Sequence, residues 1–177
     1  MLRVPVMGVL ILFNYVSQTT IWPELAILGV TPDTALIFIV SYGMLRGEIE
    51  GALFGLAAGF LMDIFGGEYL GVYALMGFLA GYVSGKPFRD FFKDNYFLPF
   101  FIVLGMALVY QFALYVALFM FRGHLDFWFY VYSIILPKTV YTAALAIPLY
   151  LLVHIINKRV ETFENNRRSL FEDKEND

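Results

Sequence analysis

Residues 46–85 read RGEIEGALFGLAAGFLMDIFGGEYLGVYALMGFLAGYVSG, and the prediction of the fold starts from them. The stretch contains two apolar segments of membrane length, which are joined by a tight turn at residues 66–67. Glycine recurs at every fourth position of each segment, at Gly51, Gly55 and Gly59 and again at Gly77, Gly81 and Gly85. Residues four apart share one face of a helix, and small residues allow helix backbones to approach closely in lipid. The pattern predicts a helical hairpin at the packed centre of the molecule.

The composition predicts a membrane protein. The chain has 177 residues, of which 60% are hydrophobic and 19% aromatic, and its mean hydropathy is +0.71. A soluble domain of this size cannot bury so much apolar surface. The chain has no cysteine, which excludes a disulfide and a thiolate metal site, and its two histidines lie on different predicted segments. We therefore expect an all-α, polytopic membrane domain that holds no cofactor or metal and binds no nucleic acid.

Six transmembrane helices are expected from the apolar segments. They cover about residues 4–21, 32–45, 47–65, 69–85, 97–121 and 128–157. The second segment is shorter than the roughly 20 residues that a span needs. Pro137 and Pro148 predict kinks in the sixth. Residues 1–157 then form the transmembrane domain, and residues 158–177 form a charged cytoplasmic tail. The tail is either a short amphipathic helix that frays into a disordered acidic end or a solvated segment throughout.

The positive charges predict that both ends of the chain lie in the cytoplasm. With six spans and the N-terminus inside, ten of the twelve Lys and Arg residues fall on the cytoplasmic side, five of them in the tail. Arg122 alone falls outside, and Lys138 falls within the sixth span. Basic residues in short loops set the orientation of a membrane protein. An N-in/C-in arrangement is therefore expected.

Three charged residues are expected near the outer ends of the spans. Asp33 opens the second span, Asp63 lies near the outer end of the third, and Lys138 lies in the outer third of the sixth. A charge inside the bilayer is costly, although a lysine side chain is long enough to reach the interface. Two interpretations remain open. In one, Lys138 neutralises Asp63 or Asp33 in an outward-facing polar cluster; in the other, each charge is separately wetted at the interface.

No catalytic constellation is present in the sequence. It has no pair of carboxylates with a histidine, no nucleophile motif and no metal-ligand spacing. Residues 81–87 differ from a phosphate-binding loop, because three residues instead of four separate the glycines and a proline replaces the hydroxyl residue. The sequence therefore predicts that the protein is not an enzyme.

An ordered set of residues resembles the MreD family of rod shape-determining proteins. The residues are Pro32-Asp33, Arg46-Gly47, Gly51, Gly55, Gly59, Asp63, Gly66, Leu70-Gly71 and Tyr73. The length of the chain, the six expected spans and the charged tail agree with this family. The positions read as structural or partner-contacting, from the resemblance and from the glycine and charge patterns, are Pro32, Asp33, Arg46, Gly51, Gly55, Gly59, Asp63, Gly71, Gly77, Gly81 and Lys138.

The resemblance implies a non-enzymatic, multi-pass protein of the bacterial cytoplasmic (inner) membrane. Such a protein belongs to the cell-elongation (rod) complex, where it helps to control cell shape and lateral peptidoglycan synthesis. The implied partner is MreC, which has one span and a large periplasmic part. The MreB filament and the polymerase and transpeptidase of wall synthesis are implied as direct or indirect partners, and a homo-oligomer is possible. The family brings no catalytic residues.

Two other function classes compete with this interpretation. Substrate-binding membrane subunits of vitamin or micronutrient importers are also small six-span proteins, and in that case Asp33, Asp63 and Lys138 would line an outward pocket for a small polar molecule. A membrane enzyme that acts on lipid-linked substrates would need acid–base residues, which the sequence does not provide.

Overall fold

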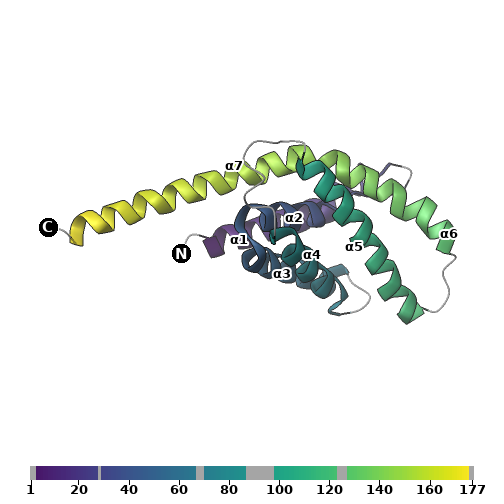
Figure 1. Ribbon diagram of the computed structural model, residues 1–177. Helices are drawn as coiled ribbons and strands as arrows, with labels where there is room; N and C mark the ends of the chain where they lie inside the picture. Colours follow the sequence, from purple (N-terminus) through teal and green to yellow (C-terminus); the bar gives the residue numbers. More distant parts are fainter. Residues whose placement is uncertain (1–2, 28, 67–69, 87–97, 123–126, 176–177) are drawn as a thin grey trace.

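The computed structural model describes residues 3–27, 29–66, 70–86, 98–122 and 127–175, and their regular structure is helical apart from one backbone bridge between Ile27 and Val30 (Figure 1). The elements in chain order are α1 (Arg3–Thr20), α2 (Thr34–Arg46), α3 (Glu48–Gly66), α4 (Val72–Gly85), α5 (Leu98–Arg122), α6 (Phe127–Tyr130), the π-helix η1 (Val131–Ile135) and α7 (Leu136–Glu175). The all-α fold class predicted from the sequence is confirmed within these ranges.

The helix at the centre of the bundle is α2. It contacts α1, α3, α4, α5 and α7, and its residues from Thr34 to Met44 are all buried. The hairpin of α3 and α4 packs more closely than any other pair, but each of its helices buries only one face. Phe60 on α3 and Leu79 on α4, for example, are 52% and 44% exposed. The prediction that the hairpin forms the packed centre is therefore wrong, because the other helices pack around α2 and leave the outer faces of α3 and α4 uncovered.

The C-terminal part of the chain forms one long helical run. α6, η1 and α7 follow one another without a gap, and α7 packs on both α5 and α2. Pro137 lies in the first turn of α7, directly after η1. A proline cannot donate the backbone hydrogen bond of a regular helix, and a wider π-turn is one way to accommodate that loss. Pro148 lies inside α7.

α7 continues well beyond the sixth predicted segment. It runs to Glu175 and projects away from the bundle (Figure 1). The predicted short amphipathic helix that frays after residue 157 is wrong in its length, because α7 stays helical to Glu175. The physical reason is local: residues 149–175 contain neither glycine nor proline, so nothing in the sequence ends the helix there.

The lengths of the helices agree with a membrane protein. Among the described residues, three stretches are long and apolar enough to cross a membrane: Glu48–Gly66, Phe100–Ala117 and Val131–Val160. α2 and α4 are apolar but shorter. Large apolar side chains such as Leu53 and Val109 are exposed on the outside of the bundle, as expected for a protein whose solvent is lipid.

Candidate functional site

The glycine ridges of α3 and α4 face one another. A Cβ atom on Gly55 would overlap the backbone carbonyl of Gly77, and a Cβ on Gly81 would overlap the carbonyl of Gly51. Gly59 meets the backbone of Tyr73 in the same way. The two backbones thus touch along the whole hairpin, as the spacing of the glycines predicts. This contact holds the two ends of the hairpin in fixed positions.

A glycine outside the predicted ridges extends this interface to the central helix. A Cβ on Gly43 of α2 would overlap the hydroxyl of Ser84 and the carbonyl of Gly81, and one on Gly51 would overlap Gly43 itself. α2, α3 and α4 therefore meet backbone to backbone near the Arg46 end of α2. The sequence does carry a signal for Gly43, because it stands four residues before Gly47 and so continues the series of Gly51, Gly55 and Gly59 toward the N-terminus.

The carboxylate of Asp63 caps the neighbouring helix. Asp63 lies on α3 and is 2% exposed, and its two oxygens accept hydrogen bonds from the backbone N–H groups of Tyr73 (3.0 Å) and Ala74 (2.9 Å). These N–H groups belong to the first turn of α4, which has no partner for them within the helix. Gly71, with φ +96°, turns the chain into α4 but provides no side chain for a cap. Asp63 on α3 therefore provides the hydrogen-bond acceptors that the backbone N–H groups at the start of α4 need.

Asp33 joins three helices at the other end of α2 from Arg46. Its Oδ1 accepts a hydrogen bond from the backbone N–H of Leu36 (3.1 Å), which makes it the N-cap of α2. Its Oδ2 accepts one from Nε2 of Gln111 on α5 (3.3 Å) and lies 3.7 Å from Nζ of Lys138 on α7. Its own N–H donates to the hydroxyl of Thr142 on α7 (2.9 Å). Asp33 is therefore the centre of a buried polar network.

A glutamine from α1 completes the network. Nε2 of Gln18 donates to the backbone carbonyl of Pro32 (2.9 Å), and its Oε1 accepts from the backbone N–H and the hydroxyl of Thr34. Pro32 is buried against this amide just before the cap. Sequence reasoning missed the roles of Gln18, Gln111 and Thr142. The available signal was that each of them is a polar residue within an apolar segment, because polar side chains in lipid form hydrogen bonds between helices.

The sequence left open which carboxylate Lys138 neutralises. The structure pairs it with Asp33, whereas Asp63 is occupied by the N–H groups of α4. The Lys138 side chain is 24% exposed and reaches the pair from the edge of the bundle. The two aspartates therefore have separate structural roles.

A pocket of about 230 Å³ opens beside the ion pair. Asp33 and Lys138 contribute charges to its lining, and Tyr73, Gln18 and Thr19 contribute further polar groups. Tyr15 and Phe65, whose ring centroids are 5.5 Å apart, provide aromatic surface. Because the charges of Asp33 and Lys138 cancel, the pocket suits a neutral polar group better than an ion. Within the described part of the chain, no three metal-binding side chains lie close enough together to hold an ion.

Breaking the Asp33–Lys138 pair is expected to show energetic coupling. Lys138→Met leaves Asp33 with its cap and with Gln111, whereas Asp33→Asn leaves a partly buried ammonium without its counter-charge. We expect the double variant to be more stable than the sum of the two single effects predicts, by about 1 kcal/mol. Thermal unfolding of the four proteins in one detergent measures this coupling. Additive effects would mean that the 3.7 Å contact contributes nothing.

The comparison with protein families gives a match to most of the chain. A family model described as rod shape-determining protein MreD matches residues 1–160, so that residues 161–177 lie outside the match. No curated protein and no solved structure matches the chain.

Proposed function

The chain belongs to the MreD family of rod shape-determining proteins, and from this premise we propose that it is a non-enzymatic, integral-membrane component of the cell-elongation complex of bacteria. In this role it binds MreC and helps to control cell shape and lateral peptidoglycan synthesis. The observation that carries the proposal is the family match over nearly the whole helical bundle. The resemblance seen in the sequence is confirmed by that match.

The packing of the bundle supports a binding role. The contact of α2, α3 and α4 through glycine leaves little freedom for these helices to move against one another. The outer faces of α3 and α5 carry exposed apolar side chains, such as Leu56 and Phe112, on which a single partner helix can pack. We propose that MreC binds through its one span, and that the MreB filament and the wall-synthesis enzymes associate directly or through MreC.

The proposed topology has six spans with both ends in the cytoplasm, and the protein resides in the bacterial cytoplasmic membrane. Thirteen residues in α2 give a helix of about 20 Å, which is shorter than the roughly 30 Å hydrocarbon core. Because five other helices contact α2, its side chains pack against protein and not against lipid. Its short length is therefore compatible with a position inside a membrane domain that comprises residues 1–157.

Co-purification tests the proposed function. The tagged, full-length protein is extracted from its native membrane in a mild detergent, and everything that elutes with it is identified by mass spectrometry. We expect MreC in a fixed ratio to the tagged protein, together with wall-synthesis enzymes. A polytopic protein of unrelated function with the same tag provides the control. Elution of neither MreC nor wall-synthesis enzymes above that control would contradict the proposal.

The outer pocket gives a specific reason to keep the importer subunit as a second candidate. A pocket of about 230 Å³ with a partly buried ion pair and aromatic surface has the composition of a site for a small polar molecule. In that case the same purification yields an ATPase pair or a bound vitamin, and Lys138→Met lowers the amount of the bound molecule. Co-purification of an ATPase pair or a bound vitamin would replace the scaffold role by a role in transport.

A further inference from the structure

The outer pocket beside the Asp33–Lys138 pair lies where several helices begin or end. Thr19 stands in the last turn of α1, Gly66 is the last residue of α3, and Tyr73 stands in the first turn of α4. α3 is long and apolar enough to cross a membrane, so its end lies near the lipid headgroups. The pocket is therefore at the level of the headgroups and not in the middle of the hydrocarbon region.

The two charges in the pocket can each bind a further group. Nζ of Lys138 lies 3.7 Å from Oδ2 of Asp33, which is longer than the roughly 3.2 Å limit of an N–H···O hydrogen bond. The ammonium therefore keeps its N–H donors available for another acceptor. Oδ2 of Asp33 accepts a hydrogen bond from Gln111, and an ionised carboxylate oxygen has a lone pair for a second one. The pocket thus presents a positive donor and a negative acceptor side by side.

This pair of charges selects a zwitterion. A single ion would be attracted by one of the two side chains and repelled by the other. A ligand with both charges can place its anionic group on Lys138 and its cationic group on Asp33. A phosphate is a strong acceptor for an ammonium, and a primary ammonium is a strong donor for a carboxylate. Joined by two carbons, these two groups form phosphoethanolamine.

The size and the rim of the pocket agree with this group as part of a lipid. The volume of about 230 Å³ equals that of about eight water molecules at ~30 Å³ each, and a phosphoethanolamine group has about as many non-hydrogen atoms. Phe65, which lines the pocket, is 65% exposed, and Phe60 and Ile64 on the same helix are each 52% exposed. Because these side chains offer apolar surface next to the pocket, a headgroup with acyl chains fits better than a soluble molecule.

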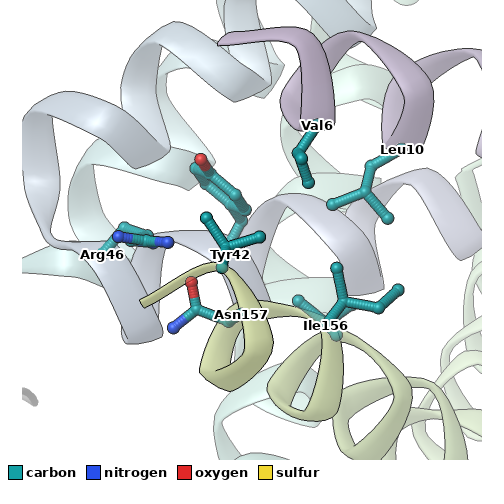
Figure 2. Close-up of a pocket in the computed structure, with 8 residues that line it drawn as sticks. Val6, Leu10, Tyr42, Arg46, Ile156 and Asn157 are labelled. Atoms are coloured by element: carbon teal, nitrogen blue, oxygen red, sulfur yellow. The ribbon is translucent and has the colours of Figure 1, made fainter. Parts of the chain in front are cut away.

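A slot at the opposite end of α2 is too small for such a ligand. Arg46, Asn157 and Ile156 close on it between α1, α2 and α7, and its volume is about 10 Å³ (Figure 2). That is room for about one water molecule. Nε of Arg46 and Oδ1 of Asn157 are buried there without a partner within the described part of the chain, and one water is a suitable partner for either. A headgroup therefore fits the outer pocket and not this slot.

We propose that the outer pocket binds the headgroup of phosphatidylethanolamine. The phosphate lies on Lys138, the ammonium lies on Asp33, and the acyl chains lie against the outer face of α3. Such a lipid joins α2 and α7 through their charges and fills the space that α1 and α3 line. This inference rests on neither of the two functions proposed above, because a lipid in the outer pocket requires no protein partner and no transport.

Titration of the purified, full-length protein with phosphatidylethanolamine in detergent tests the proposal, with native mass spectrometry as the readout. We expect Lys138→Met to weaken binding about tenfold, because the charge-assisted hydrogen bond to the phosphate is lost. Lys158→Met is the matched control, because it makes the same change on the same helix at an exposed position outside the pocket lining. Its expected effect is below about twofold.

A second variant keeps the test valid if Lys138→Met fails to fold. Thr19 is exposed, and tryptophan is favoured at the level of the headgroups. Thr19→Trp narrows the pocket with both charges in place, and we expect it to lower binding of phosphatidylethanolamine as well. Unchanged binding by a folded Thr19→Trp variant would count against the pocket as the site.

Comparison of headgroups tests the zwitterion. Phosphatidylcholine keeps the phosphate, but its trimethylammonium has no N–H to donate to Asp33, and phosphatidylglycerol has no positive charge. Each is expected to bind about fivefold more weakly than phosphatidylethanolamine. Glycerophosphoethanolamine, the soluble headgroup without acyl chains, is expected not to displace the lipid at equal concentration. Equal binding of the three lipids, equal effects of Lys138→Met and Lys158→Met, or displacement by the soluble headgroup would overturn the proposal.

Discussion

Replacement of Gly55 by leucine is expected to destabilise the folded bundle more than any other substitution considered for this protein. A Cβ at this position already overlaps the carbonyl of Gly77 and presses on Ile39 of α2, so three helices would have to separate. The atoms in the way are largely backbone atoms, which cannot move aside as a flexible side chain can. We expect a loss of stability of about 3 kcal/mol or more, the upper end of what overpacking costs. Size-exclusion chromatography and thermal unfolding in detergent measure the loss.

A glycine in open space provides the control for this experiment. Gly105 lies on α5, and a Cβ added there meets no other atom within 4 Å. Gly105→Leu adds the same side chain to an apolar helix, and we expect a yield and unfolding temperature close to those of the unchanged protein. A normal elution profile for Gly55→Leu would contradict the backbone contact between α3 and α4, and equal damage at both sites would point to an effect of leucine itself.

Charge reversal at Asp63 has the second large expected effect. Asp63→Lys removes both acceptors from the N–H groups of Tyr73 and Ala74 and places an ammonium at the positive end of α4. Because residue 63 is buried, the new charge would have no solvent. Hydrogen bonds to a charged group contribute about 1.5–3 kcal/mol each, so the loss of two is expected to cost about 3 kcal/mol or more. The unfolding temperature in detergent reports the change.

The same reversal at Glu48 separates the cap from a general charge effect. Glu48 begins α3, is only half-buried and makes no described hydrogen bond to another helix, so Glu48→Lys is expected to cost less than Asp63→Lys. Asp63→Asn keeps one oxygen for one of the two N–H groups and is expected to fall between the two. Equal tolerance of the two reversals would show that the cap of α4 is not needed.

The amino-acid sequence determined the class of the protein and the local features of its helices. The sequence predicted a pair of membrane helices in backbone contact. This prediction rested on the hydropathy of the two segments and on the glycines at every fourth position of each. These features are predictable because helix periodicity and apolar composition depend only on near neighbours along the chain. The order of Pro32, Asp33, Arg46 and the glycines also carried the family resemblance.

Which side chains meet across the bundle follows from the packing of the helices and not from the sequence of any one of them. Lys138 pairs with Asp33, and Asp63 caps α4 instead, although both carboxylates stood at suitable positions in the sequence. The central place of α2, the contribution of Gly43 and the network through Gln18 were also decided at this level. The reason is that a contact between two helices depends on how each one is rotated and crossed against its neighbours. That arrangement follows from the packing of the whole bundle, and no single segment encodes it.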